Sequence, residues 1–372
     1  MRFVDLFCGC GGMSWGLQQD GCELLLGIDN EKNYIKTFEE NFGSDKTLLA
    51  DIKIITGKDI LEKINLKKGE LELLVGGPPC QGFSKNTPVS KRDADSENNL
   101  LIHEFLRITK EIKPKNIVIE NVAEMKRGFG GKYTSEIITK LNSMGYFVIN
   151  HIFDASDFGT PQKRKRAFFI GSLEKKDISV PAPTHFDKDN PKKSNRNLDL
   201  FPGQKTNKIT IKDAISDLPN LKHGQGEEIS KYISKPQNDY QKYMRINSKK
   251  VSNHISRKLS NKQFERYSSL KPGEGNKQLP DHLRTKGGYS GAYGRLTWDS
   301  ISPTITRWVF HPGSGRWGHP KDIRSLSIRE IARIQSFSDD FVFKGTFNEI
   351  CGQLGNAVPP LLMKTVVSCL RD

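Results

Sequence analysis

The chain has 372 residues and a net charge of +15, and hydrophobic residues make up 35% of it. This composition predicts a folded protein with room for one large and one smaller core. No apolar run reaches the roughly 18 residues of a membrane span, and the first residues lack a signal-peptide pattern, so we expect a cytoplasmic protein with no membrane partner.

Residues 1–171 alternate between short apolar runs and amphipathic stretches. The amphipathic stretches at 31–42 and 99–112 predict helices. The apolar runs predict strands at 3–7, 24–28, 71–75, 116–120, 146–152 and 167–170. Such alternation predicts an α/β fold with a mainly parallel sheet and helices on both of its faces.

The character of the chain changes after Gly171. Residues 172–292 are polar, basic and only weakly periodic, and they predict a smaller, loop-rich domain. Order returns near Arg295: Ser327-x-x-Glu330 matches a capping box that opens a helix, and a last helix is expected near Pro360. We therefore expect a first domain at 1–171, the loop-rich domain at 172–292, and a segment at 293–372 that returns to the first domain.

The positive charge is concentrated in one part of the chain. Residues 181–290 hold twice as many basic as acidic residues, and 241–264 hold seven basic residues and no acidic one, together with Tyr243 and Phe264. A focused basic and aromatic stretch favours nucleic acid as the partner. A merely solvated basic surface is the weaker alternative.

The six cysteines exclude some kinds of site. None forms a C-x-x-C pair or clusters with histidines, so no metal site is predicted. A disulfide framework is not expected in a chain of this size without an export signal. We expect reduced thiols that are mostly buried as small hydrophobic side chains.

The segment VDLFCGCGGMSWG leads from the first predicted strand into a helix. Gly9, Gly11 and Gly12 allow a tight turn and the close approach of a ligand, whereas Ser14 departs from the dinucleotide-binding pattern. Asp29 and Asp51 follow the next two strands and suit a ribose and an adenine amino group. The set fits S-adenosylmethionine, although turn glycines beside capping aspartates fit these residues equally well.

The segment LLVGGPPCQGFS at 73–84 leads from a strand through two glycines and two prolines to Cys80. The prolines fix φ and hold the loop in one shape, and open α/β sheets bind ligands at the carboxyl ends of their strands. A buried structural thiol would not need a rigid turn. Cys80 is therefore predicted to be a nucleophile.

These motifs resemble, in the same order, those of the DNA cytosine-5 methyltransferases. GGPPCQGFS is similar to the family's catalytic loop, and DLFCGCGG to its cofactor loop. The later matches are Glu120–Asn121–Val122, the Gln-x-Arg-x-Arg run at 162–166, Arg295 with Pro303–Thr304, and GNAVPP at 355–360. Only residues 172–292 stay outside the resemblance.

The resemblance implies a Rossmann-like, S-adenosylmethionine-dependent methyltransferase domain with a target-recognition domain at 172–292. It implies that Cys80 adds to cytosine C6 and that Glu120 stabilises charge near N3. It also implies that one of Arg164 and Arg166 contacts the cytosine carbonyl oxygen and the other the Cys80 region or nearby backbone. It implies a cofactor pocket of Phe7, Gly9, Gly11, Gly12, Asp29, Asp51, Ile52, Pro79, Asn356 and Val358. It implies substrate contacts from Gln81, Ser84, Asn121, Gln162, Arg295 and Thr304.

The substrate that follows from the resemblance is a specific sequence of double-stranded DNA. Attack at C6 needs a ring face that is stacked in the duplex, so the cytosine must be flipped out. We expect a monomer associated with a prokaryotic nucleoid, and a cognate restriction endonuclease could act on the same site. The target sequence cannot be deduced from residues 172–292.

Two rival functions remain open on the sequence. The first is an enzyme of the same fold that acts on transfer RNA; its relatives carry a Cys-Phe-Thr motif, which this chain lacks. The second is a non-catalytic DNA-binding protein on the same scaffold. Such a protein would not need Cys80 or Glu120, and both are present.

Overall fold

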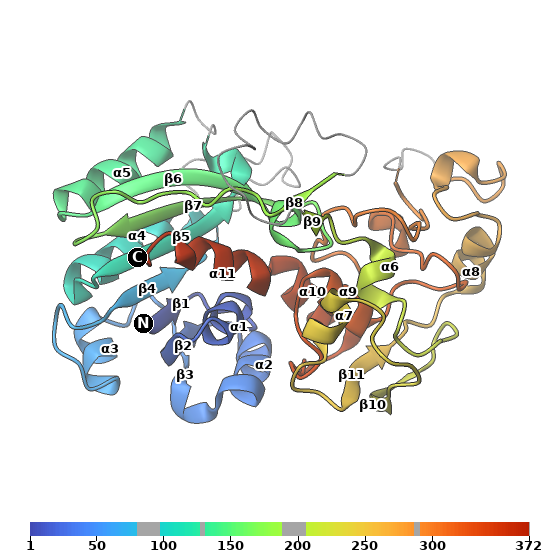
Figure 1. Ribbon diagram of the computed structural model, residues 1–372, viewed down its shortest axis with the longest axis horizontal. Helices are drawn as coiled ribbons and strands as arrows, with labels where there is room; N and C mark the ends of the chain where they lie inside the picture. Colours follow the sequence, from blue (N-terminus) through green and yellow to red (C-terminus); the bar gives the residue numbers. More distant parts are fainter. Residues whose placement is uncertain (80–96, 127–130, 188–205, 286–290, 372) are drawn as a thin grey trace. The chain divides into compact units, whose positions relative to one another are not determined.

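The computed structural model describes residues 1–79, 97–126, 131–187, 206–285 and 291–371 (Figure 1). By its internal contacts the chain divides into two compact units. The first, here called the sheet unit, consists of 1–155, 165–183 and 358–372. The second unit consists of 156–164 and 184–357.

The sheet unit contains most of the regular structure. Its strands are β1 (Arg2–Leu6), β2 (Glu23–Asp29), β3 (Thr47–Leu49), β4 (Leu73–Gly76), β5 (Asn116–Val122), β6 (Phe147–Asp154) and β7 (Lys165–Ser172). Its helices are α1 (Gly12–Gln19), α2 (Lys32–Phe42), α3 (Gly57–Lys63), α4 (Glu97–Ile112), α5 (Lys132–Ser143) and α11 (Pro360–Ser368), with 3-10 turns η1 (Ser44–Lys46) and η4 (Ala123–Lys126).

The seven strands form one sheet in the order β3-β2-β1-β4-β5-β7-β6 (Figure 1). The pairs β3–β2, β2–β1, β1–β4 and β4–β5 are parallel, and β7 runs antiparallel to both β5 and β6. The predicted α/β fold with a mainly parallel sheet is confirmed. Because the chain reverses its direction of progress between β1 and β4, the topological switch point lies at the carboxyl ends of these two strands.

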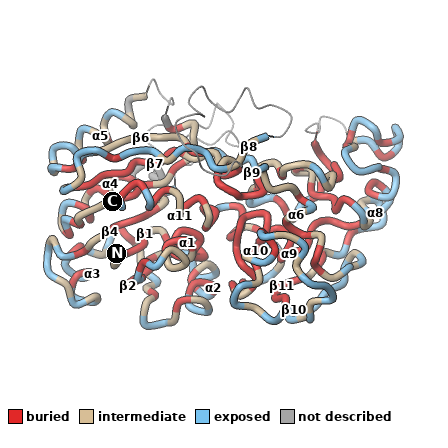
Figure 2. Tube along the Cα trace, in the orientation of Figure 1, coloured by how far each residue is buried: buried red, intermediate tan, exposed pale blue. Residues whose placement is uncertain are grey.

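Alternate residues of the strands pack against helices on opposite faces of the sheet. Val4 and Leu6 of β1 belong to one apolar core with Phe105 of α4 and Ile60 of α3. On the other face a Cβ at Gly27 of β2 would lie 2.2 Å from the ring of Phe38 on α2, so glycine is required there. Figure 2 shows the central strands β1, β4 and β5 as mostly buried. Helices therefore cover both faces, as the sequence predicted.

The second unit is built from short elements. They are the 3-10 turns η6 (Ala155–Phe158), η8 (Asn276–Gln278) and η9 (Pro312–Ser314), the strands β8 (His185–Phe186), β9 (Thr206–Asn207), β10 (Gly226–Lys231) and β11 (Lys250–Ile255), and the helices α6 (Ile211–Ile215), α7 (Asp239–Met244), α8 (Asn261–Ser268), α9 (Ile328–Ile334) and α10 (Phe347–Asn356). Capping boxes open α6, α8, α9 and α10. The predicted box at Ser327–Glu330 is thus confirmed, as is Pro360 in the first turn of α11.

Buried ion pairs around α9 hold this unit together. Arg333 is fully buried and contacts Asp217 at 2.5 Å and Asp339 at 2.6 Å. Glu330 pairs with Arg324 at 2.8 Å. Burial alone would raise the pKa of Glu330, but the Arg324 guanidinium holds it well below its usual range. Removing one partner of such a pair would leave an uncompensated buried charge.

These contacts explain why the unit boundaries differ from the expected ones. Arg333 joins Asp217, and Tyr240 donates to the Arg333 carbonyl at 2.5 Å, so α9 orders a stretch more than 90 residues earlier. Residues 293–357 consequently lie with 184–292, and only 358–372 return to the sheet unit. The local pattern of polar and apolar residues gives no information about such distant pairs.

Candidate active site

The glycine loop after β1 has the tight geometry that its sequence predicts. Phe7, Gly9 and Gly11 have positive φ values of 62°, 57° and 101°. A Cβ at Gly11 would lie 2.4 Å from the ring of Phe42, so a side chain is excluded by space as well as by conformation. Helix α1 then begins at Gly12.

Asp29, at the end of β2, is part of the same structure. Its Oδ2 accepts a hydrogen bond from the Gly9 N–H at 2.8 Å, and its Oδ1 accepts one from the Glu31 N–H at 2.9 Å. Burial raises the pKa of this carboxyl, and the two N–H donors oppose the rise. The loop and the acid that sequence reasoning treated as one site are thus in direct contact.

Asp51 follows the adjacent strand β3. The Ala50 N–H donates to the Asp29 carbonyl at 3.0 Å, which brings the ends of the two strands together. Ile52 is 5% exposed and packs into the core, while its carbonyl accepts from Arg107 of α4 at 2.8 Å. Arg107 therefore holds the segment that carries Asp51, a role that the sequence did not suggest.

Asp5 was also missed, although it belongs to the DLF motif. It is fully buried in β1, its Oδ2 accepts from Ser14 Oγ of α1 at 2.6 Å, and its Oδ1 has no hydrogen-bond partner among the described residues. Burial raises the pKa of Asp5 from 3.8 to about 7. The hydrogen bond between Ser14 and Asp5 holds the start of α1 to the sheet directly beneath the glycine loop.

Replacing Asp5 with asparagine should stabilise the protein in a pH-dependent way. Between pH 4 and 7 folded Asp5 keeps a proton that the unfolded chain has released, so its contribution to stability falls as pH rises. Asp5→Asn keeps the acceptor for Ser14 and removes this loss. The free energy of unfolding of the variant, measured with urea, should exceed that of the wild type by near zero at pH 4 and by a few kcal/mol (roughly 1.4 kcal/mol per unit of pKa shift) at pH 8. A gain that is constant across this range would contradict the prediction.

The chain leading to Cys80 runs beside the end of β5. A Cβ at Gly77 would lie 3.1 Å from Glu120 Oε2 and 3.6 Å from Met13 of α1. Asn121, which is 4% exposed, donates to the Pro78 carbonyl at 3.1 Å. Pro79 is exposed and is the last residue described before Cys80, which lies outside the described residues together with Gln81 and Ser84.

Glu120 and Arg166 form the central ion pair of this edge. Arg166 Nε lies 2.8 Å from Glu120 Oε1, and the two side chains are only 16% and 12% exposed. They come from the antiparallel neighbours β5 and β7, in which Val122 is opposite Arg166. A cation at this distance fixes the orientation of the carboxyl group.

Arg164 has a different environment from Arg166. It is 1% exposed and donates to the carbonyls of Ile305 and Gly355, at 2.8 Å each. Gln162, also buried, accepts from the Ile305 N–H at 2.8 Å, and Thr304 donates to the Lys163 carbonyl at 2.6 Å. Arg164 therefore bonds to the backbone of the second unit, and which of the two arginines contacts the cytosine stays a prediction.

Arg295 is likewise an interior residue of the second unit. It is 5% exposed and donates to the carbonyls of His319, Leu270, Pro320 and Lys321. Burial lowers its pKa. These contacts support a positioning role, and the expected contact with the substrate stays a prediction. Asn356 ends α10 and is exposed, and Val358, the first residue that returns to the sheet unit, is 5% exposed.

The basic run at 241–264 does not form one uniform surface, because it is divided among α7, β11 and α8. Arg245 is nearly buried, pairs with Asp217 and lies over the Tyr232 ring. Arg257 donates to the Phe310 carbonyl at 2.6 Å. Lys249, Lys258 and Lys262 are exposed. Part of the positive charge therefore serves internal packing.

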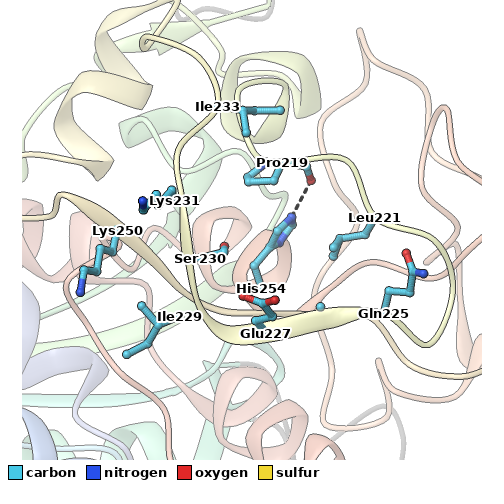
Figure 3. A pocket seen from close by; sticks show the side chains of 11 residues that line it. Pro219, Leu221, Gln225, Glu227, Ile229, Ser230, Lys231, Ile233, Lys250 and His254 are labelled. Atoms are coloured by element: carbon cyan, nitrogen blue, oxygen red, sulfur yellow. Dashed lines mark hydrogen bonds between the residues drawn. The ribbon is translucent and has the colours of Figure 1, made fainter.

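A cavity of about 880 Å³ lies beside the β10–β11 hairpin of the second unit (Figure 3). It is lined by Ile229, Ile233, Lys231 and Lys250, with His254 donating to the Pro219 carbonyl at 2.7 Å. None of the predicted site residues lines it, so it is separate from the candidate site. Within the described residues no group of acidic, histidine or cysteine side chains could hold a metal ion, and no helix could span a membrane.

Comparisons with known proteins point to one family. The family model for C-5 cytosine-specific DNA methylases matches residues 1–371. Among curated relatives, the Type II methyltransferase M1.HphI of Haemophilus parahaemolyticus is 32% identical over 373 residues, covering 100% of this chain and 86% of the relative. The Type II methyltransferase M.AgeI of Thalassovita gelatinovora is 29% identical over 432 residues, covering 100% and 99%.

Solved structures share the fold. The crystal structure of a candidate DNA modification methyltransferase encoded within a prophage of E. coli has a TM-score of 0.77 at 22% identity, covering 100% of this chain and 98% of that one. Since the family model spans essentially the whole sequence, the chain belongs to the C-5 cytosine-specific DNA methylase family.

Proposed function

We propose that the protein transfers a methyl group from S-adenosylmethionine to C5 of a flipped-out cytosine in a specific sequence of duplex DNA. The observation that carries the proposal is the position of Glu120. Its carboxylate is held by Arg166 at 2.8 Å and lies 3.1 Å from the Cβ position of Gly77, in the loop that reaches Cys80 three residues later. The chain that leads to Cys80 and the carboxyl group of Glu120 thus lie at one edge of the sheet.

The residues of the sheet unit fit S-adenosylmethionine. The glycine loop is held to Asp29 by the hydrogen bond from the Gly9 N–H, and the carboxylates of Asp29 and Asp51 follow adjacent strands at the same edge of the sheet. Carboxylates accept hydrogen bonds from ribose hydroxyls and from an adenine amino group. The cofactor would supply an electrophilic methyl group attached to a sulfonium.

The chain's own groups would carry the chemistry at the base. The Cys80 thiolate forms a bond to C6, and the C5–C6 electron pair becomes available at C5 for the methyl carbon. Glu120 accepts a hydrogen bond from the exocyclic amine through one oxygen and donates a proton or a hydrogen bond from the other toward N3, where negative charge develops, while Arg166 keeps the side chain in place. Loss of the C5 proton, to water or another base, restores the double bond and releases the thiolate.

The second unit would bind the DNA and recognise its sequence. Attack at C6 requires the cytosine to leave the stack, at a cost of a few kcal/mol. Contacts between basic side chains and phosphates offset this cost. The designation of the relatives as Type II methyltransferases supports action on the same sequence as a cognate restriction endonuclease.

The function is tested by asking which nucleic acid receives the methyl group. Bisulfite sequencing of DNA from cells that express the chain should reveal one methylated sequence. Purified protein should then transfer tritiated methyl groups to a duplex with this sequence, and neither to transfer RNA nor to the duplex already methylated at C5. Label on transfer RNA alone would establish the RNA enzyme instead, and label on neither would support the non-catalytic alternative.

A further inference from the structure

One tryptophan of the second unit is presented to solvent on a well-held turn. Trp308 is 50% exposed, and the guanidinium of Arg307 lies over its ring, 5.4 Å from the centroid. The segment 306–314, here called the Trp308 turn, is fixed by its own hydrogen bonds. Ser314 Oγ donates to the Trp308 carbonyl at 2.6 Å, and the His311 N–H donates to the same carbonyl at 2.9 Å. The hydrogen-bonded backbone of the turn thus keeps a large apolar ring exposed to solvent.

The base of this turn is anchored by two residues of the Gln-x-Arg-x-Arg motif. Gln162 accepts from the Ile305 N–H, and Arg164 donates to the Ile305 carbonyl, both at 2.8 Å. Behind the turn, a Cβ at Gly355 would lie 2.2 Å from the Arg307 nitrogen, so glycine is needed for the close approach of the two segments. These residues therefore determine where Trp308 is presented.

Aromatic and basic groups continue from the Trp308 turn. The rings of Trp308 and Phe310 lie 5.7 Å apart, and Arg257 donates to the Phe310 carbonyl at 2.6 Å while lying 5.6 Å from its ring. Next to Arg257, Lys258 is exposed. The exposed aromatic surface is thus bordered by cations, which suits a partner with both stacking faces and negative charge.

We propose that Trp308 stacks on a DNA base that loses its neighbour when the target cytosine leaves the helix, with Arg307 beside it at the phosphates. This inference rests on the proposed function and adds a residue to it. Stacking on an aromatic side chain would offset part of the cost of flipping. A protein partner would also use an exposed tryptophan, but the two arginines that lie over the rings of this surface favour a polyanion.

The test compares three variants on the duplex that bisulfite sequencing identifies. Trp308→Ala should weaken binding about tenfold and reduce the fluorescence gain of 2-aminopurine placed at the target position. Because no charge is removed, the slope of log Kd against log salt should not change. Trp308→Phe keeps a stacking face and should restore most of the DNA affinity and most of the 2-aminopurine fluorescence gain. Arg307→Gln should lower the salt slope by about one phosphate contact.

Phe147 of the sheet unit provides the matched control. It is an exposed aromatic residue, 42% accessible, with Lys176 located 5.8 Å from the centre of its ring. Phe147→Ala should bind and flip like the wild type. If Trp308→Ala also did so, or if Trp308→Phe were as impaired as the alanine variant, stacking by Trp308 would be refuted. Because the wild-type protein is assayed for methyl transfer on the same duplex, failure of the proposed function is detected separately.

Discussion

Replacing Cys80 with serine should abolish methyl transfer and leave DNA binding largely intact. A serine hydroxyl holds its proton far more tightly than a thiol, so it supplies almost no anion at neutral pH and cannot add to C6. The expected loss is at least about 10⁴-fold in kcat, typical for removal of a covalent nucleophile. Tritiated methyl transfer measures the rate, and fluorescence anisotropy with the same duplex measures binding.

A covalent trap distinguishes loss of the nucleophile from general damage. A duplex with 5-fluorocytosine at the target position cannot lose a proton from C5, so the bond between Cys80 and C6 should persist in denaturing gels. The wild type should give this adduct in the presence of S-adenosylmethionine, and Cys80→Ser should give none. An adduct of unchanged yield in the variant would show that another group attacks the base.

The other thiols provide a control with a physical basis. Burial raises the pKa of Cys10 to about 12 and that of Cys369 to about 11, so neither forms a thiolate readily. Cys369 lies directly after α11, and Cys369→Ser should retain both methyl transfer and the covalent adduct. Loss of the adduct in this variant as well would indicate that cysteine replacement disturbs the fold.

The sequence predicted the family and the sheet because both depend on local patterns. Buried parallel strands appear in a sequence as continuous apolar runs. The motifs occur along the chain in the family's order, and the family model that matches residues 1–371 confirms the family assignment. The contact between Gly9 and Asp29 also follows from topology, since adjacent parallel strands end at the same edge.

The sequence could not separate the roles of the two arginines in one motif. Arg164 and Arg166 are two residues apart, but Arg166 meets Glu120 across the sheet and Arg164 meets carbonyls more than 140 residues away. Their environments depend on these partners and not on local spacing. The same reason explains why Arg245, in the run that predicted DNA binding, is nearly buried against Asp217.

Replacing Glu120 with glutamine should slow methyl transfer by about 10²- to 10⁴-fold while cofactor affinity changes little. The amide keeps the size of the side chain, but it loses the charge that pairs with Arg166 at 2.8 Å. The amide also has no acidic proton to transfer toward N3 as negative charge develops there. Asp29 and the glycine loop are untouched, so isothermal titration with S-adenosylmethionine should give a Kd within about threefold of the wild type.

Glu136→Gln provides a matched control, since Glu136 on α5 pairs with Lys140 at 2.7 Å in a more exposed position, and surface pairs contribute little. A double variant tests whether the pair at the site acts as one unit. If Arg166 works by holding Glu120, then Glu120→Gln combined with Arg166→Gln should be no slower than the slower single variant, because the interaction is already lost. Additive losses would instead mean that Arg166 contacts the base independently, through its own guanidinium and the cytosine carbonyl oxygen.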